Sequence, residues 1–148
     1  MALESGEHHQ ERRGDKKEGD YYATRVYVNF LYDPEKASPR ERTQYGTART
    51  LYGKYPPKAA INYVWANKLP KGKGIDNAYT SRARMIAVES GSEKAGKWVK
   101  EERNIYKDYL TLFGEEPPKA MGVAIMTDTD DTKERAVAHY ADISLCRE

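Results

Sequence analysis

Apolar and polar residues alternate along several segments of this chain, as they do in β-strands that cover a core with one face. The clearest example runs from Tyr22 to Phe30, where every second residue is aromatic or β-branched. Proline and glycine lie between these segments and mark turns. The predicted strands are residues 21–31, 59–67, 81–90, 97–104, a segment within 115–127, and 136–145.

Two other segments have helical spacing. Ser38 is a good helix cap and Pro39 suits a first helical turn, so a helix is predicted from Pro39 to about Tyr52. A second helix is predicted within 104–114, where Gly114 supplies the stop. Its apolar positions recur three or four residues apart: Ile105, Tyr109, Leu112 and Phe113.

Strands joined by long, irregular connections favour a mainly β fold. We predict an antiparallel β-sandwich, jelly-roll-like, with one or two short helices. Residues 1–18 are expected to form a charged, flexible tail, and residues 19–148 a single sandwich domain that lacks N-terminal strands. The strand at 21–31 would then lie at an open edge of its sheet, which predicts self-association.

Composition narrows the function classes. Lys and Arg number 25 against 23 Asp and Glu, a net charge of +2, and this balance argues against nucleic acid or an anionic membrane as partner. No apolar run approaches the roughly 20 residues that cross a membrane. Cys146 is the only cysteine, so an intrachain disulfide and a cysteine zinc site are excluded.

The segment "MTDTDDT", residues 126–132, is the candidate metal site. In a strand, Asp128 and Asp130 lie on one face, and two neighbouring carboxylates need a cation, an arginine or a proton between them. Calcium is the natural hard cation for oxygen ligands. The alternatives are an Asp-rich turn that caps backbone amides and an ion pair with an arginine such as Arg103.

Aromatic and arginine positions suggest a binding site. Tyr63 and Trp65 share a strand face and could form a platform for a sugar ring, with amide and guanidinium groups as hydrogen-bonding partners. The alternative is that Trp65 and Trp98 are core residues. The predicted ligand-binding residues are Arg25, Asn62, Tyr63, Trp65, Glu101 and Arg103.

With these segments laid out, the chain resembles the bacterial domain-of-unknown-function family 3047. The matching pieces, in order, are "GDYYATRVYVNF", "YGKYPPKAAINYVWAN", "ESGSEKAGKWVKEERNIYKDYLTLFGEEPP", "VAIMTDTDDT" and "AHYADISL", from about Gly19 to Leu145. The resemblance implies no activity, because none is assigned to the family. Family members look like larger, often exported proteins with further strands before the first piece, which implies a periplasmic or secreted location for a full-length member. The first twenty residues lack the apolar segment of a signal peptide, so none is expected within this sequence.

The resulting expectation is a non-catalytic, ligand-binding β-sandwich for carbohydrate or a small molecule, with no cofactor other than the calcium considered above. One alternative is a glycan-acting enzyme that uses Glu101 with Asp128 or Asp130 as paired carboxyls. Another is a structural envelope module. An exposed Tyr63 or Trp65 on a concave face would favour binding, and two facing carboxyls, one with a raised pKa, would favour the enzyme.

Overall fold

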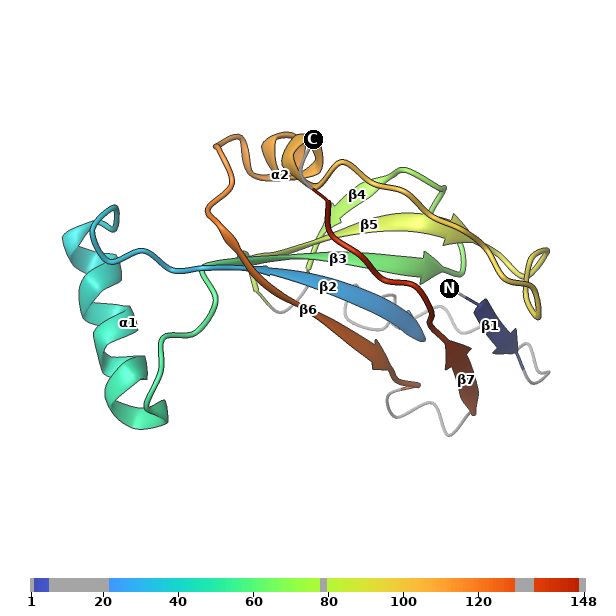
Figure 1. The fold of residues 1–148 in the computed structure, drawn as a ribbon, viewed down its shortest axis with the longest axis horizontal. Helices are drawn as coiled ribbons and strands as arrows, with labels where there is room; N and C mark the ends of the chain where they lie inside the picture. Colours follow the sequence, from blue (N-terminus) through green and yellow to red (C-terminus); the bar gives the residue numbers. More distant parts are fainter. Residues whose placement is uncertain (1, 6–21, 78–79, 130–134, 147–148) are drawn as a thin grey trace.

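The computed structural model describes residues 2–5, 22–77, 80–129 and 135–146. Within them, a single five-stranded mixed sheet carries the fold, and a separate two-stranded ribbon joins the two ends of the chain (Figure 1). The elements are β1 (Ala2–Ser5), β2 (Thr24–Phe30), α1 (Pro39–Tyr52), β3 (Ala59–Ala66), β4 (Gly74–Asp76), β5 (Ala83–Ser90), α2 (Ile105–Phe113), β6 (Ala120–Thr127) and β7 (Ala136–His139).

The sandwich and jelly-roll prediction is wrong. The strands form one sheet in the order β4-β5-β3-β2-β6, and the ribbon consists of β1 and β7. β3 and β5 run parallel, whereas the other neighbouring strands of the sheet are antiparallel. With one mixed sheet and two helices, the protein is α/β.

The burial of β3 and β5 explains the error. All six residues from Ile61 to Ala66 are buried, and so are the five from Met85 to Glu89. Central strands of a mixed sheet are covered on both faces, whereas a sandwich sheet hides only one. Alternation in the sequence therefore indicated strands correctly but not which strands pair.

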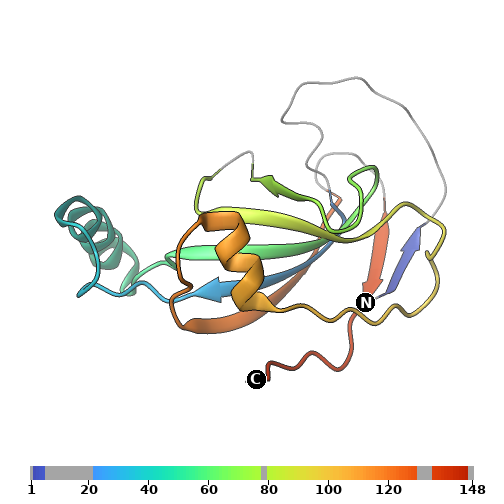
Figure 2. The ribbon, with the colours of Figure 1, turned by 90° about the horizontal axis from the view of Figure 1, so that it is seen from above.

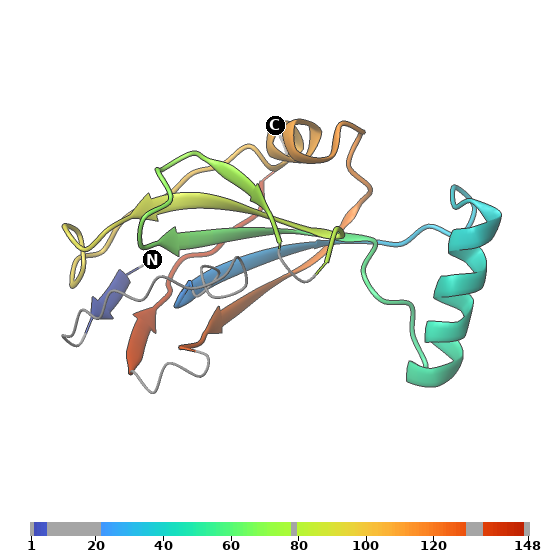
Figure 3. The same ribbon diagram turned by 180° about the vertical axis from the view of Figure 1, so that it is seen from behind.

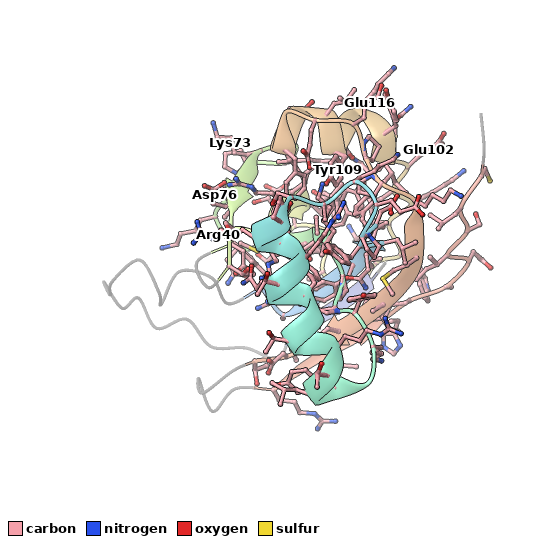
Figure 4. The ribbon with its side chains drawn as sticks, turned by 90° about the vertical axis from the view of Figure 1, so that its left-hand side faces the viewer. Arg40, Lys73, Asp76, Glu102, Tyr109 and Glu116 are labelled. Carbon is pink, nitrogen blue, oxygen red and sulfur yellow. The ribbon has the colours of Figure 1, made fainter. Side chains whose placement is uncertain are left out.

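Helix α2 covers one face of the sheet (Figures 1 and 2). Tyr109 is fully buried there, and its ring lies 4.6 Å from that of Phe30 and 4.4 Å from that of Phe113. In Figure 4 the side chain of Tyr109 extends from α2 toward the sheet. The opposite face of the sheet carries a second buried cluster: Tyr22, Val64, Ala66, Met85 and Ala87. We call the two sides the α2 face and the opposite face.

Helix α1 projects from one end of the sheet (Figures 1 and 4). Its bounds are those predicted, with Ser38 as cap in a capping box with Glu41 and with Gly53 in the left-handed conformation at its end. Tyr45 is the one buried residue of α1, and it stacks on Tyr32 with 3.8 Å between ring centroids. The Tyr45 hydroxyl also donates to the Pro57 and Lys58 carbonyls, so this one side chain supplies most of the attachment of the helix.

Most other predicted elements are confirmed, with four differences. Residues 97–104 form no strand, and the last predicted strand is regular only over β7. The first predicted strand, β2, lies between β3 and β6, so the expected open edge at residues 21–31 is wrong. β1 and β4 were not predicted; β1 falls within the predicted N-terminal tail, and each has at most four residues. None of the described helices is long and apolar enough to cross a membrane.

Candidate functional site

A buried polar contact joins β3 to α2. Tyr63 donates a 2.8 Å hydrogen bond to Oδ2 of Asp108, in the first turn of α2. Arg103, just before the helix, binds the same carboxylate with one edge of its guanidinium group: Nε lies 3.0 Å from Oδ2 and Nη2 2.5 Å from Oδ1. Asn104 caps the helix by accepting from the Lys107 amide. The cap and the two-pronged ion pair fix the position of Asp108.

The environment holds these groups in defined protonation states. Burial, and then the hydrogen bond to Asp108, raise the pKa of Tyr63 far above its ordinary value, so the phenol stays neutral. The hydrogen bonds to Asp108 also raise the pKa of Arg103, which keeps its charge. A neutral hydroxyl and a fixed cation thus share one carboxylate.

A second polar cluster lies around Glu89, which is buried at the end of β5. Its Oε2 accepts from Lys94 at 2.7 Å and from Lys71 at 3.4 Å, and Lys71 also donates to Glu101 at 2.8 Å. Burial by itself would raise the pKa of Glu89, but the bonds from Lys94 and the Ser90 amide, with the charge of Lys71, hold it below the ordinary value.

The two clusters form a series of alternating charges, because the negative charge of Glu101 also acts on Arg103. Asp108, Glu101 and Glu89 each face at least one cation in this series. Asp128, the other carboxyl of the enzyme hypothesis, lies elsewhere, at the end of β6, where its amide donates to Ala23. The geometry therefore gives no support to an acid–base pair of Glu101 and Asp128.

The structure separates the predicted ligand-binding residues into two groups. Tyr63 and Trp65 lie on the α2 face, where Asp108 links Tyr63 to Arg103, and Glu101 accepts from Lys71. Asn62 alternates with Tyr63 and so points to the opposite face. The register places Arg25 on that face too, where its Nε donates to the Tyr22 carbonyl.

The predicted aromatic platform is not exposed. Tyr63 is 7% and Trp65 2% accessible, and the Trp65 indole donates to the Gly91 carbonyl at 2.8 Å. Both therefore pack in the interior, which is the alternative considered for Trp65. Asn62 is buried as well, and its Oδ1 has no hydrogen-bond partner among the described residues. A ligand role for these residues stays a prediction.

The aspartate segment can be followed only in part. Asp128 lines a hollow with Thr127, Thr129, Arg135 and Ala136, but Asp130 lies outside the described residues. Within the described part of the chain, no three His, Cys, Asp or Glu side chains gather where they could hold a metal ion. The calcium site and the turn both stay predictions.

Of the two tryptophans, Trp98 is the one at the surface. Its side chain is 63% exposed, and its ring centroid lies 6.3 Å from that of His139. The interpretation of Trp98 as a core residue is therefore wrong. A signal was nevertheless available, because Trp98 is in step with Lys100 and Glu102, both of them exposed. In an extended segment every second side chain lies on the same side, and a side that carries charged residues faces the solvent.

A scan against protein families matches residues 7–144 to the family described as "Protein of unknown function (DUF3047)". The chain belongs to this family. The resemblance stated from the sequence is thereby confirmed over nearly the whole chain. No curated protein and no solved structure matched it.

Proposed function

We propose that this DUF3047 chain is a non-catalytic carbohydrate-binding domain, in which Trp98 is the residue that stacks on the sugar. The exposed indole of Trp98 carries the proposal. A tryptophan is a large apolar side chain that folding normally covers, so one left two-thirds exposed beside an imidazole suggests a contact surface. The flat face of an indole suits the apolar face of a sugar ring.

The segment that carries Trp98 is anchored at both ends. The Trp65 indole holds the Gly91 carbonyl before it, and Arg103 holds Asp108 after it. Between these points Val99 is half-buried. An aromatic side chain on a fixed backbone loses little entropy on binding, which favours affinity.

Exposed polar residues flank Trp98 along the chain. Lys97, Lys100 and Glu102 are exposed on the same segment, and His139 adds a ring nitrogen. Hydroxyl groups of a sugar can accept from the lysines and donate to the carboxylate. This mixture favours a carbohydrate over a purely apolar ligand. The glycans of the bacterial envelope are the natural candidates if the protein is exported, which is part of the proposal.

Tryptophan fluorescence tests the proposal, because Trp65 and Trp98 are the two tryptophans. The intact protein would be titrated with soluble chitin and peptidoglycan oligosaccharides and sedimented with insoluble cellulose, chitin and peptidoglycan. Binding should protect Trp98 from acrylamide quenching and shift its emission to shorter wavelength. Buried Trp65 should report no change, as a Trp98→Phe variant would verify.

The variant Trp98→Ala should lose sugar binding at least tenfold while its unfolding midpoint stays close to that of the parent. Tyr106→Ala is the matched control, since Tyr106 is also half exposed but lies on α2. It should bind as the parent does. The proposal fails if no glycan of the panel protects Trp98, or if Trp98→Ala binds as tightly as the parent.

A further inference from the structure

We propose that two copies of this chain associate by pairing their β6 strands into one continuous sheet. β6 is an edge strand, hydrogen-bonded within the sheet to β2 alone. At its C-terminal end β7 approaches the strand, and the Tyr140 hydroxyl bonds to the Met126 carbonyl and to Thr127 Oγ1. Along the rest of its outer side no described helix or strand lies (Figures 1 and 3). Ile125 is 54% and Met126 38% exposed. The strand thus presents both an unpaired edge and uncovered apolar side chains.

The hydrogen-bond pattern fixes which backbone groups face outward. Asp128 is paired with Ala23 and donates to its carbonyl at 3.1 Å, so the even-numbered residues of β6 bond to β2. In an antiparallel ladder these alternate with residues whose N–H and C=O groups point the other way. The amides of Val123 and Ile125 therefore face the open edge. Only another extended strand offers donors and acceptors at the matching spacing.

The sequence of β6 favours a second copy as that strand. Its eight residues carry no charge, so two such strands can lie side by side without repulsion. Lys119 precedes the strand and Asp128 follows it. Antiparallel pairing brings Lys119 close to the partner's Asp128, and the same contact recurs at the other end of the interface. The uncharged strand and its oppositely charged flanking residues therefore both match a second copy of the same strand.

The register follows from the regular part of the strand. The ladder to β2 shifts between Asn29 and Phe30, at Met121, so pairing is expected from Gly122 onward. A two-fold axis at Ala124 places Val123 opposite the partner's Ile125, and both of these have outward-facing backbone groups. β4, at the other edge of the sheet, has only three residues and offers a shorter ladder.

Light scattering and sedimentation of the full chain over a range of concentrations test the association. The parent should change from monomer to dimer. Ala124→Lys places two lysines at the two-fold axis and should raise the dimer dissociation constant about tenfold or more. Gln44→Lys adds the same charge on the exposed surface of α1 and should leave dimerisation unchanged. Circular dichroism would verify that both variants fold.

Charge reversal tests the partner's identity. Lys119→Asp should weaken the dimer, and adding Asp128→Lys in the same chain should restore it, because each copy then carries the reversed pair. If the natural partner were a strand of another protein, adding Asp128→Lys would not restore the association that Lys119→Asp weakens. Failure of the double variant to recover would overturn pairing with a second copy.

A disulfide tests the register. At the axis the two Ala124 residues form a non-hydrogen-bonded pair, with Cα atoms about 4.5 Å apart, which is within disulfide range. Ala124→Cys, in a Cys146→Ser background, should give a covalent dimer on mild oxidation. Gln44→Cys should stay monomeric under the same conditions. A monomeric parent at all concentrations, or equal cross-linking at both positions, would refute the proposal.

Discussion

The hydroxyl group of Tyr63 and the carboxylate of Asp108, 45 positions apart in the chain, share a buried 2.8 Å hydrogen bond. This contact ties the central strand β3 to the first turn of α2. A carboxylate at a helix N-terminus is favoured by the helix dipole, and Arg103 supplies the opposite charge. The contact positions α2 over the sheet, and with α2 the preceding segment that carries Trp98.

Replacing Tyr63 with Phe should destabilise the fold by about 1–2 kcal/mol at pH 7, because it removes a buried hydrogen bond to a charged group. Urea unfolding would measure the change. Tyr106→Phe is the control: this hydroxyl also bonds a carboxylate, that of Glu116, but at the surface, and its loss should change stability by less than about 0.5 kcal/mol. Equal effects of the two substitutions would show that the Tyr63–Asp108 contact contributes nothing special.

The same tyrosine predicts a pH dependence. In the unfolded chain a phenol ionises near pH 10, whereas burial and the bond to Asp108 raise the pKa of Tyr63 in the folded protein. The folded state thus keeps a proton that the unfolded state releases. Its contribution to stability is complete below about pH 10 and falls as the pH rises further.

Tyr63→Phe should therefore lose stability less steeply than the parent above about pH 10. Some loss should remain, because burial also raises the pKa of Tyr109. Urea midpoints measured from pH 8 to pH 11 would check this. Parallel curves for the parent and Tyr63→Phe would contradict the prediction.

Helix α1 shows which part of a structure can be predicted from sequence. Its start and end follow from local chemistry: Ser38 and Glu41 cap one end, and Gly53 supplies the left-handed residue at the other. None of these signals depends on a distant residue. The predicted bounds were therefore correct even though the helix stands away from the sheet.

Strand pairing and the Tyr63–Asp108 contact depend on distant residues, and the sequence indicated neither. Nothing in the alternation of β3 indicates that its neighbour β5 runs parallel to it. Tyr63 and Arg103 were both predicted as site residues, yet Asp108, which joins them, has the pattern of an ordinary polar helix position. Only the placement of α2 buries that carboxylate.

The attachment of α1 gives a further prediction. Tyr45→Ala removes the one buried side chain of the helix and its stack on Tyr32. We expect a cost of about 3 kcal/mol, typical of an aromatic deletion, expressed mainly as local release of α1. Limited trypsin digestion should then cut sooner at Arg42 and Arg49. Tyr52→Ala, at an exposed position of the same helix, should leave the digestion rate unchanged.

Replacing glycine with alanine should have opposite effects on stability at Gly74 and at Gly46. A Cβ atom at Gly74 would lie 2.8 Å from Cδ2 of Leu112, because α2 packs directly over β4. Cδ2 is the end of a side chain that can shift, so Gly74→Ala should destabilise the fold by about 1 kcal/mol, the low end of the cost of overpacking. Gly46 lies within α1 with no atom near its missing Cβ, so Gly46→Ala should stabilise the helix by up to about 1 kcal/mol. Thermal unfolding and helical circular dichroism would measure both. If Gly74→Ala left the free energy of unfolding unchanged, Leu112 would have to move without cost. That result would contradict tight packing of α2 on β4.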